Sequence, residues 1–138
     1  MSAEPGSPVR AAGNSARVRI AVGPLVGPVL GRGVGMLAAR ADCPVDRLED
    51  AMLVVDTLAA RAGAYVPDGR LSVDVLTGKG SLELLVGPLT GEGASSLIRD
   101  SVVPGVGNVL EHVADEVAVE QDPEGAGSVL SIRILFPA

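Results

Sequence analysis

Polar and apolar residues alternate along several stretches of the chain, and a period of two is typical of half-buried β-strands. The predicted strands are residues 17–22, 70–76, 81–86, 116–121 and 128–136. In the first of them, Val18, Ile20 and Val22 are expected to face inward. The segment 77–80 contains two glycines, so it is expected to be the turn of a β-hairpin.

Apolar residues recur every three or four positions in other stretches, which predicts amphipathic helices at 28–41, 44–62, 94–101 and 106–117. The helix 44–62 has the clearest signals, because Pro44 suits a first turn and Gly63 can end the helix. Its predicted apolar stripe is Leu48, Met52, Val55, Ala59 and Ala62. Thr57 is then expected on the opposite side, with Asp56 at the border of the stripe.

The order of elements is strand, helix, helix, strand, strand, helix, helix, strand, strand. Such an order favours an α/β (α+β) two-layer sandwich, in which helices cover one face of a mixed, mostly antiparallel sheet. Residues 1–16 are rich in Ser, Ala, Gly and Pro and show no periodicity, so they are expected to be a disordered tail. The folded domain is expected to span residues 17–138.

Composition narrows the classes of function. A chain of 138 residues with 47% hydrophobic residues suits one domain with its own core. The net charge of -6, together with a single Phe, a single Tyr and no Trp, argues against nucleic acid as a partner. The single Cys43, the lack of an apolar leader and the lack of a long apolar run predict a soluble, cytoplasmic protein that does not enter membranes.

Two glycine-spaced segments raise the question of a nucleotide site. Gly91 and Gly93 follow a strand and precede a helix, as in a loop that cradles phosphate with its backbone N–H groups. A flexible strand-to-helix loop explains the same glycines, and we favour that interpretation. Gly105 and Gly107 follow Pro104, so phosphate contact and a tight link between two helices explain them equally well.

The C-terminal third of the chain resembles a known family. Gly105 and Gly107 entering a helix, the segment 114–117 (Ala-Asp-Glu-Val) and the Gly-rich turn 125–128 resemble the end of the GHKL, or Bergerat-fold, ATPase domain of RsbW-like anti-sigma factors, which are serine-protein kinases. The resemblance implies a Bergerat-type fold, an ATP and Mg²⁺ site, and a sigma factor or a STAS anti-anti-sigma protein as partner. It also implies a homodimer or a heterodimer with a related kinase.

The catalytic half of that pattern is missing. Active relatives carry a Glu base and, four residues later, an Asn that ligates Mg²⁺. Aligning Arg61 with the family's His puts Thr57 at the Asn position and Leu53 at the base position, and a shift of one residue puts Asp56 and Met52 there. Asp56 can ligate Mg²⁺ through its carboxylate, but Leu and Met cannot accept a proton. Aligning the family's later glycine with Gly91 places Gly87 where an Asp would bind adenine.

These residues predict an anti-sigma-like regulatory protein that acts by protein binding, with a degenerate nucleotide site and no kinase activity. The residues that would line that site are Asp56, Thr57, Gly91, Gly93, Gly105 and Gly107, with Asp56 as the metal ligand and no catalytic residue. Two alternatives stay open: an ATP-dependent serine/threonine-protein kinase that acts on a STAS protein, and an acidic scaffold unrelated to sigma factors.

Overall fold

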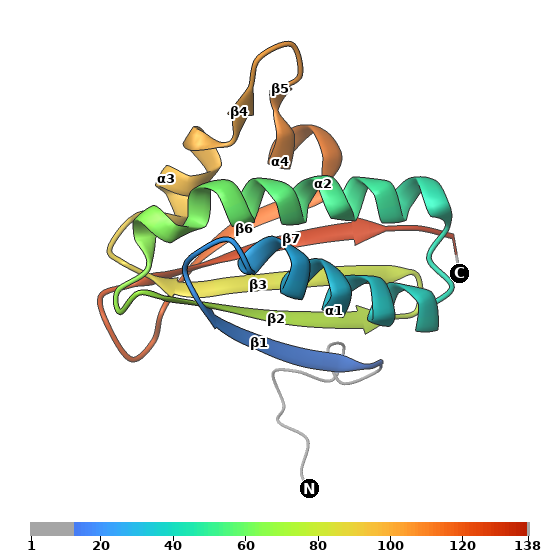
Figure 1. The fold of residues 1–138 in the computed structure, drawn as a ribbon, viewed down its shortest axis with the longest axis horizontal. Coiled ribbons are helices and arrows are strands. Elements are labelled where there is room, and N and C mark those ends of the chain that lie inside the picture. Colours follow the sequence, from blue (N-terminus) through green and yellow to red (C-terminus); the bar gives the residue numbers. More distant parts are fainter. Residues whose placement is uncertain (1–12, 138) are drawn as a thin grey trace, which may run out of the picture.

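A computed structural model describes residues 13–137 and contains one five-stranded sheet with the spatial order β1-β2-β3-β7-β6 (Figure 1). The strands are β1 (Ser15–Ala21), β2 (Arg70–Gly78), β3 (Ser81–Leu89), β6 (Glu116–Gln121) and β7 (Ser128–Leu135). All four neighbouring pairs are antiparallel, so the sheet, expected to be mixed and mostly antiparallel, is antiparallel throughout.

The helices form the second layer. They are α1 (Val26–Arg40), α2 (Val45–Arg61), α3 (Gly93–Asp100) and α4 (Val109–Val113), and a 3-10 turn η2 (Ala62–Tyr65) extends α2. Figure 1 shows α1 and α2 side by side over one face of the sheet. The predicted two-layer sandwich with helices on one face is therefore confirmed.

The core lies between these layers. Every second residue of the central strands faces the helices and is buried, as Leu82, Leu84 and Val86 of β3 illustrate. Helix α1 approaches α2 closely through two glycines: a side chain at Gly27 would contact Ala59, and one at Gly31 would contact Met52 and Val55. Small residues at these two positions let the helix axes come together without a gap in the core.

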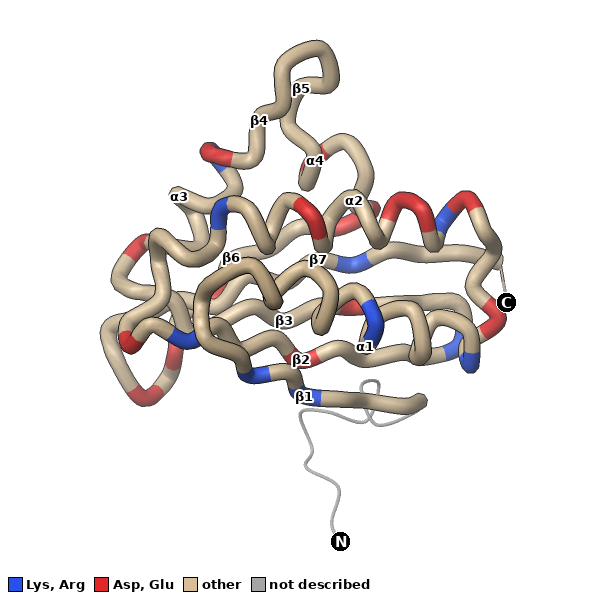
Figure 2. The backbone as a smooth tube through the Cα atoms, in the orientation of Figure 1, with Lys and Arg blue, Asp and Glu red and all other residues tan. Residues whose placement is uncertain are grey.

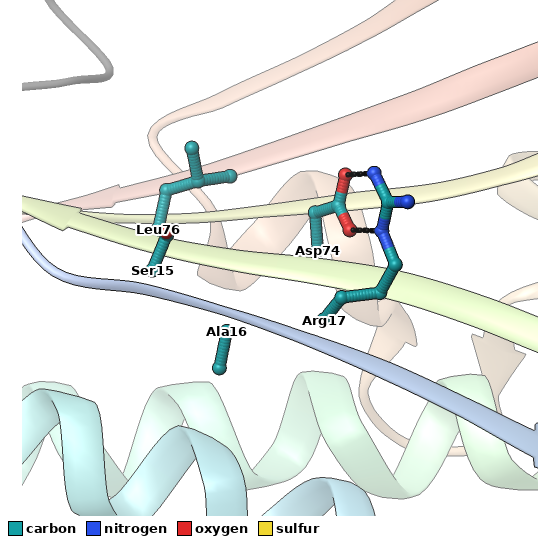
Figure 3. Close-up of a pocket in the computed structure, with 5 residues that line it drawn as sticks. All are labelled: Ser15, Ala16, Arg17, Asp74 and Leu76. Atoms are coloured by element: carbon teal, nitrogen blue, oxygen red, sulfur yellow. Dashed lines mark hydrogen bonds and ion pairs between the residues drawn. The ribbon is translucent and has the colours of Figure 1, made fainter.

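No helix lies over the opposite face of the sheet (Figure 1), and Figure 2 marks the charged residues along the strands. Arg17 of β1 and Asp74 of β2 are register partners there, and the guanidinium donates two hydrogen bonds to the carboxylate, at 2.7 and 3.2 Å (Figure 3). Arg133 and Glu116 form a further ion pair at 3.3 Å. Both pairs are exposed to water, so screening keeps their contribution to stability small.

Three local expectations differ from the structure. Strand β1 begins at Ser15, inside the expected tail, and residues 1–12 of that tail lie outside the described residues. Val22 follows the end of β1 and is 45% exposed, so it does not face inward. The helix expected at 106–117 is only α4, because Ala114 is extended and the Asp115 N–H donates to the Arg133 carbonyl of the sheet.

A short β-hairpin between α3 and α4 has no counterpart in the predicted elements. It consists of β4 (Val102–Val103) and β5 (Gly107–Asn108) and projects beyond α2 on the side away from α1 (Figure 1). Among residues 13–137, no helix has the length and the apolar character that crossing a bilayer requires.

Candidate functional site

A groove of about 190 Å³ lies between α2 and the β4–β5 hairpin, and it contains two of the predicted site residues, Asp56 and Thr57. Its walls are mostly apolar and are formed by Leu53, Thr57, Ala60, Val103, Val106 and Val109, with Asp56 and Arg61 as the charged members. Leu53 and Val106 are 41% and 44% exposed, so the apolar surface continues outside the groove. We call this feature the α2–hairpin groove.

The hairpin that forms one wall is held at its base. Asn108 Nδ2 donates to the Ile98 carbonyl at 2.7 Å, and its Oδ1 accepts the Glu111 N–H at 3.1 Å as the N-cap of α4. The Val109 N–H donates to the Ser101 carbonyl at 2.8 Å, and this bond joins the two ends of the segment that contains the hairpin. Arg61 Nη2 reaches from α2 to the Val102 carbonyl at 3.3 Å. These contacts fix the hairpin relative to α2.

Thr57 is buried, with only 6% of its surface exposed, whereas the helical periodicity predicted that it would face outward. Thr57 is buried because α4 and the hairpin pack against a side of α2 that its apolar stripe alone predicts to be exposed. The Thr57 hydroxyl donates to the Leu53 carbonyl of the preceding helical turn at 2.9 Å. The hydroxyl proton of Thr57 is therefore engaged in a hydrogen bond within the helix, and the hydroxyl oxygen would be only a weak ligand for a metal ion.

Asp56, the predicted metal ligand, is exposed at the edge of the groove and has no hydrogen bond or ion pair with another described residue. Within residues 13–137, no three His, Cys, Asp or Glu side chains come together in a group able to hold a metal ion. A single carboxylate supplies one of the six oxygen ligands that Mg²⁺ requires, so nucleotide phosphates and water would have to supply the others.

Gly105 and Gly107 lie in the β4–β5 hairpin, with φ angles of +83° and +92° that an L side chain rarely adopts. The Val106 N–H donates to the Val103 carbonyl at 3.0 Å inside this turn. The two glycines therefore fit one of the two interpretations from the sequence, a tight link between α3 and α4, which takes the form of a β-hairpin. Phosphate contact by these glycines stays a prediction.

Gly91 and Gly93 lie between β3 and α3 and do not line the α2–hairpin groove. Gly91 lines a separate pocket with residues of the β6–β7 turn, whereas Gly93 is buried beneath Tyr65 and Leu89. The Gly93 N–H donates to the Thr90 carbonyl at 2.6 Å, and the Ala94 N–H donates to the buried Ser128 Oγ at 3.0 Å. Two of the first N–H groups of α3 are thus used inside the protein, which leaves a poor cradle for phosphate.

Gly87 lines a pocket on the open face of the sheet, together with Arg17 and Asp74. Its φ angle is +134°, and a Cβ atom there would lie 2.9 Å from the Ser128 carbonyl oxygen. The backbone at this position therefore does not accept an Asp, and the position faces away from the helices. The next inward residue of β3 is Leu89, which is 1% exposed and lies within the core.

Three described side chains have shifted pKa values, and none of them lines the α2–hairpin groove. The hydrogen bond to Asp74 raises the pKa of Arg17. The Tyr65 hydroxyl donates a hydrogen bond to Asp100, and this bond to a carboxylate raises the pKa of Tyr65 above its usual value. Partial burial raises the pKa of the Cys43 thiol, although Arg47 nearby opposes the shift. A raised thiol pKa disfavours the nucleophilic thiolate.

The sequence patterns missed the hairpin side of the groove, namely Val103, Val106 and Val109. Val102 and Val103 are β-branched and precede a Pro-Gly pair, which is a hairpin signal, but two-residue strands are too short to show alternation. Only the tertiary fold brings these valines against Leu53 and Thr57.

Comparison with known proteins gives a likeness of fold. No protein-family model and no curated protein matches the chain. A solved structure described as the crystal structure of the SiaB-SiaC complex from Pseudomonas aeruginosa contains a chain similar to this one, with a TM-score of 0.58 and 11% identity. The match covers 88% of this chain and 89% of that chain. The two chains therefore share a fold over nearly their whole lengths.

Proposed function

We propose that this protein is a regulatory binding protein of the anti-sigma type, which acts through protein contacts and does not transfer phosphate. The observation that carries the proposal is the lining of the α2–hairpin groove. Leu53, Val103, Val106 and Val109 suit an apolar side chain of a partner, whereas a triphosphate requires several N–H or cationic donors. Arg61, the cation at the groove, already donates to the Val102 carbonyl.

The chemistry that a kinase needs is absent from the corresponding positions. In either alignment of α2, the position of the general base holds Met52 or Leu53, and neither side chain can accept a proton. The alignment with the family places Gly87 at the acidic position of its adenine-binding motif. Because glycine has no side chain to accept a hydrogen bond, the amine of adenine would lose a bond worth about 1.5–3 kcal/mol.

The resemblance in the C-terminal third implies a sigma factor or a STAS anti-anti-sigma protein as the partner. The solved structure with a similar fold is described as a complex of two proteins, which agrees with a role in protein association. The net charge of -6 favours a partner with a basic surface.

Calorimetric titration of the full chain with MgATP tests the loss of the nucleotide site, with ADP and EDTA as controls. We expect no saturable heat up to millimolar nucleotide. A ligand present at one hundred times its Kd would stabilise the fold by about 2.7 kcal/mol and raise the melting temperature by several degrees. For millimolar MgATP we expect instead a shift of less than about 1 °C, because the site does not bind it. A shift of several degrees would show that the site still binds nucleotide.

Binding of partners is tested with purified sigma factors and STAS proteins against the full chain. Val106→Asp should weaken the complex at least tenfold, because it puts a charge into an apolar groove. Val119→Asp is the matched control, since Val119 is 37% exposed on β6 and does not line the groove. If neither kind of protein binds, the acidic-scaffold alternative replaces the proposal.

The alternative of an active kinase is favoured by one observation, the exposed and unpartnered carboxylate of Asp56 at the groove. It predicts transfer of labelled phosphate from ATP to a serine of a STAS protein, with loss of transfer in Asp56→Ala. Such a result would contradict the proposal directly.

A further inference from the structure

Strand β6 forms the border of the sheet opposite to β1, and β7 is its single partner among the strands of residues 13–137 (Figure 1). Five of its six residues are exposed, so the neighbouring helices do not cover this border. An uncovered edge strand presents backbone N–H and C=O groups that have no partner in the sheet. Such a strand can pair with an extended segment of another protein.

The hydrogen-bond pattern shows which groups of β6 face outward. Just beyond the strand, the Asp122 N–H donates to the Gly127 carbonyl at 2.9 Å, which continues the β6–β7 register. Bonded positions recur at every second residue of an antiparallel strand, so the even-numbered residues of β6 bond to β7. The odd-numbered residues, Val117, Val119 and Gln121, therefore direct their N–H and C=O groups away from the sheet. Each of them offers one donor and one acceptor to an added strand.

The face of β6 on the helical side is apolar. Val119 is the register partner of Leu130, which is fully buried, so Val119 lies on the side of the sheet that carries the helices. Val117 lies on the same side and packs against the core. Val119 is 37% exposed, because no further strand lies beside it. An added strand with aliphatic side chains at alternate positions would cover this surface.

The segment around β6 is acidic. Residues 114–127 contain no Lys or Arg, and their acidic residues are Asp115, Glu116, Glu120, Asp122 and Glu124. Asp115 and Glu116 form ion pairs with arginines of α2 and β7. The excess of negative charge therefore lies at the end of β6 and in the turn that follows it. Glu120 is exposed on the open face there, so basic side chains of an added strand would be favoured at that place.

The other edge strand, β1, has a different character. The Val22 N–H donates to the Gly69 carbonyl at 2.9 Å, so by the same count the odd-numbered residues of β1 face outward. They include Arg17 and Arg19. Charged side chains on an edge strand protect it from the addition of further strands. The outward-facing positions of β6 carry no charge and the strand contains no proline, so β6 is the edge that is open to addition.

We propose that β6 binds an extended segment of another protein in which aliphatic residues alternate with Arg or Lys. The segment pairs antiparallel to β6 and becomes a further strand of the sheet. Its aliphatic side chains cover Val117 and Val119 on the helical side, and its basic side chains face Glu120 and the acidic turn on the open side. This edge is distinct from the α2–hairpin groove, because no residue of β6 lines the groove.

A second copy of the chain fits this edge poorly. Two β6 strands side by side would bring acidic residues against acidic residues. Strand β1 has the required alternation, but its arginines are already bonded within their own molecule. Arg17 donates to Asp74, and the Arg19 guanidinium donates to Asp68 at 2.9 Å. A separate basic segment is therefore the better partner.

Fluorescence anisotropy measures the binding, with a labelled peptide of about eight residues in which Val alternates with Arg. We expect a Kd of about 0.1 mM, because a flexible peptide loses conformational entropy when it is ordered. A peptide with Glu in place of Arg should bind at least tenfold more weakly. A peptide of the same composition, with all Arg residues placed before all Val residues, should also bind at least tenfold more weakly, since it lacks the alternation.

Val119→Pro tests the backbone pairing. The Val119 N–H faces outward, so proline removes a donor for the added strand and leaves the β6–β7 bonds in place. The affinity for the Val-Arg peptide should fall at least tenfold, with circular dichroism as the check of folding. Ala21→Pro is the matched control, because the Ala21 N–H faces outward on β1, and this variant should bind the peptide like the unmodified chain.

A charge exchange keeps the test independent of stability. Glu120→Lys, Glu124→Lys should bind the Val-Arg peptide at least fivefold more weakly and the Val-Glu peptide at least fivefold more tightly than the unmodified chain does. Loss of folding cannot produce tighter binding of the second peptide.

Amide hydrogen exchange locates the peptide. Exchange at Val117, Val119 and Gln121 should slow when the Val-Arg peptide is added, whereas exchange at the edge of β1 should not change. The inference does not rest on the proposed function, and the two are separable. Val106→Asp should bind the peptide normally and Val119→Asp at least tenfold more weakly, which is the reverse of the order expected for the partner of the groove.

Four outcomes would overturn the inference. The first is the absence of saturable binding up to about 1 mM peptide. The second is equal affinity of Val119→Pro and Ala21→Pro, and the third is slowed exchange at β1 in place of β6. The fourth is slowed exchange at β6 in the protein alone that grows with its concentration, because a second copy of the chain would then occupy the edge.

Discussion

Arg47 of α2 and Asp115, which precedes β6, form an ion pair of 2.6 Å that joins the helical layer to the sheet. The same carboxylate oxygen of Asp115 accepts the Leu135 N–H at 2.7 Å, and Arg47 Nε donates to the Leu135 carbonyl at 3.1 Å. The start of α2 is thus tied to the end of β7 at a site where the Arg47 side chain is only 21% exposed.

Arg47→Met should remove these polar contacts while keeping most of the packing of the side-chain stem. Because Asp115 is 41% exposed, water screens the ion pair. We therefore expect the free energy of unfolding to fall by about 1 kcal/mol and the melting temperature to fall by about 3–5 °C. Thermal unfolding by circular dichroism measures the shift. Arg99→Met is the control, because Arg99 is exposed and bonds only Ser96, and an equal effect in both variants would contradict the assigned role.

Asn108→Ala should loosen the β4–β5 hairpin. It removes the N-cap of α4 and the bond to the Ile98 carbonyl, for an expected loss of about 1–2 kcal/mol. Limited proteolysis should then cut first within residues 102–107, which the hydrogen bonds at the base of the hairpin protect in the unmodified chain. Ser96→Ala removes one exposed bond and should leave both stability and the cleavage pattern unchanged.

Gly87→Ala should destabilise the protein by about 1–3 kcal/mol, because φ is +134° and the new Cβ would press against the Ser128 carbonyl. Gly35→Ala should have the opposite sign and stabilise by up to about 1 kcal/mol, since Gly35 lies inside α1 with nothing within 4 Å of the added carbon. Urea denaturation measures both. A Gly87→Ala variant as stable as the unmodified chain would contradict the predicted strain at Gly87.

Tyr65 should ionise above its usual pKa, because its hydroxyl donates to Asp100. A raised folded-state pKa means that the fold holds the phenol proton more tightly. The contribution to stability is therefore complete below the unfolded pKa of about 10 and is lost as the pH rises through the folded pKa. Ultraviolet titration is unambiguous, since Tyr65 is the only tyrosine in the chain.

Asp100→Ala should bring the midpoint of that titration back toward about 10. Glu92→Ala is the control, because Glu92 precedes α3 and does not contact the Tyr65 hydroxyl among the described bonds. An identical midpoint in the unmodified chain and in Asp100→Ala would show that the hydrogen bond does not hold the proton.

The local pattern of the sequence determined most of the elements. Helix 44–62 was expected within one residue at each end, and the strand 116–121 has the bounds predicted for it. These segments carry strong periodicity and end at residues with clear backbone preferences, such as Pro44 and Gly63. The layer arrangement also followed, because five amphipathic strands must bury one face against helices.

Tertiary contacts decided the site. Thr57 is buried because α4 and the hairpin cover it, which no periodicity of α2 can reveal. The predicted glycines are separated into the hairpin, the β3–α3 loop and the open face of the sheet, so they do not form one cradle. Helix α4 stops at Val113 because pairing with β7 competes for the backbone that follows. Local periodicity records which face of an element is apolar, whereas long-range packing alone determines which other element covers that face.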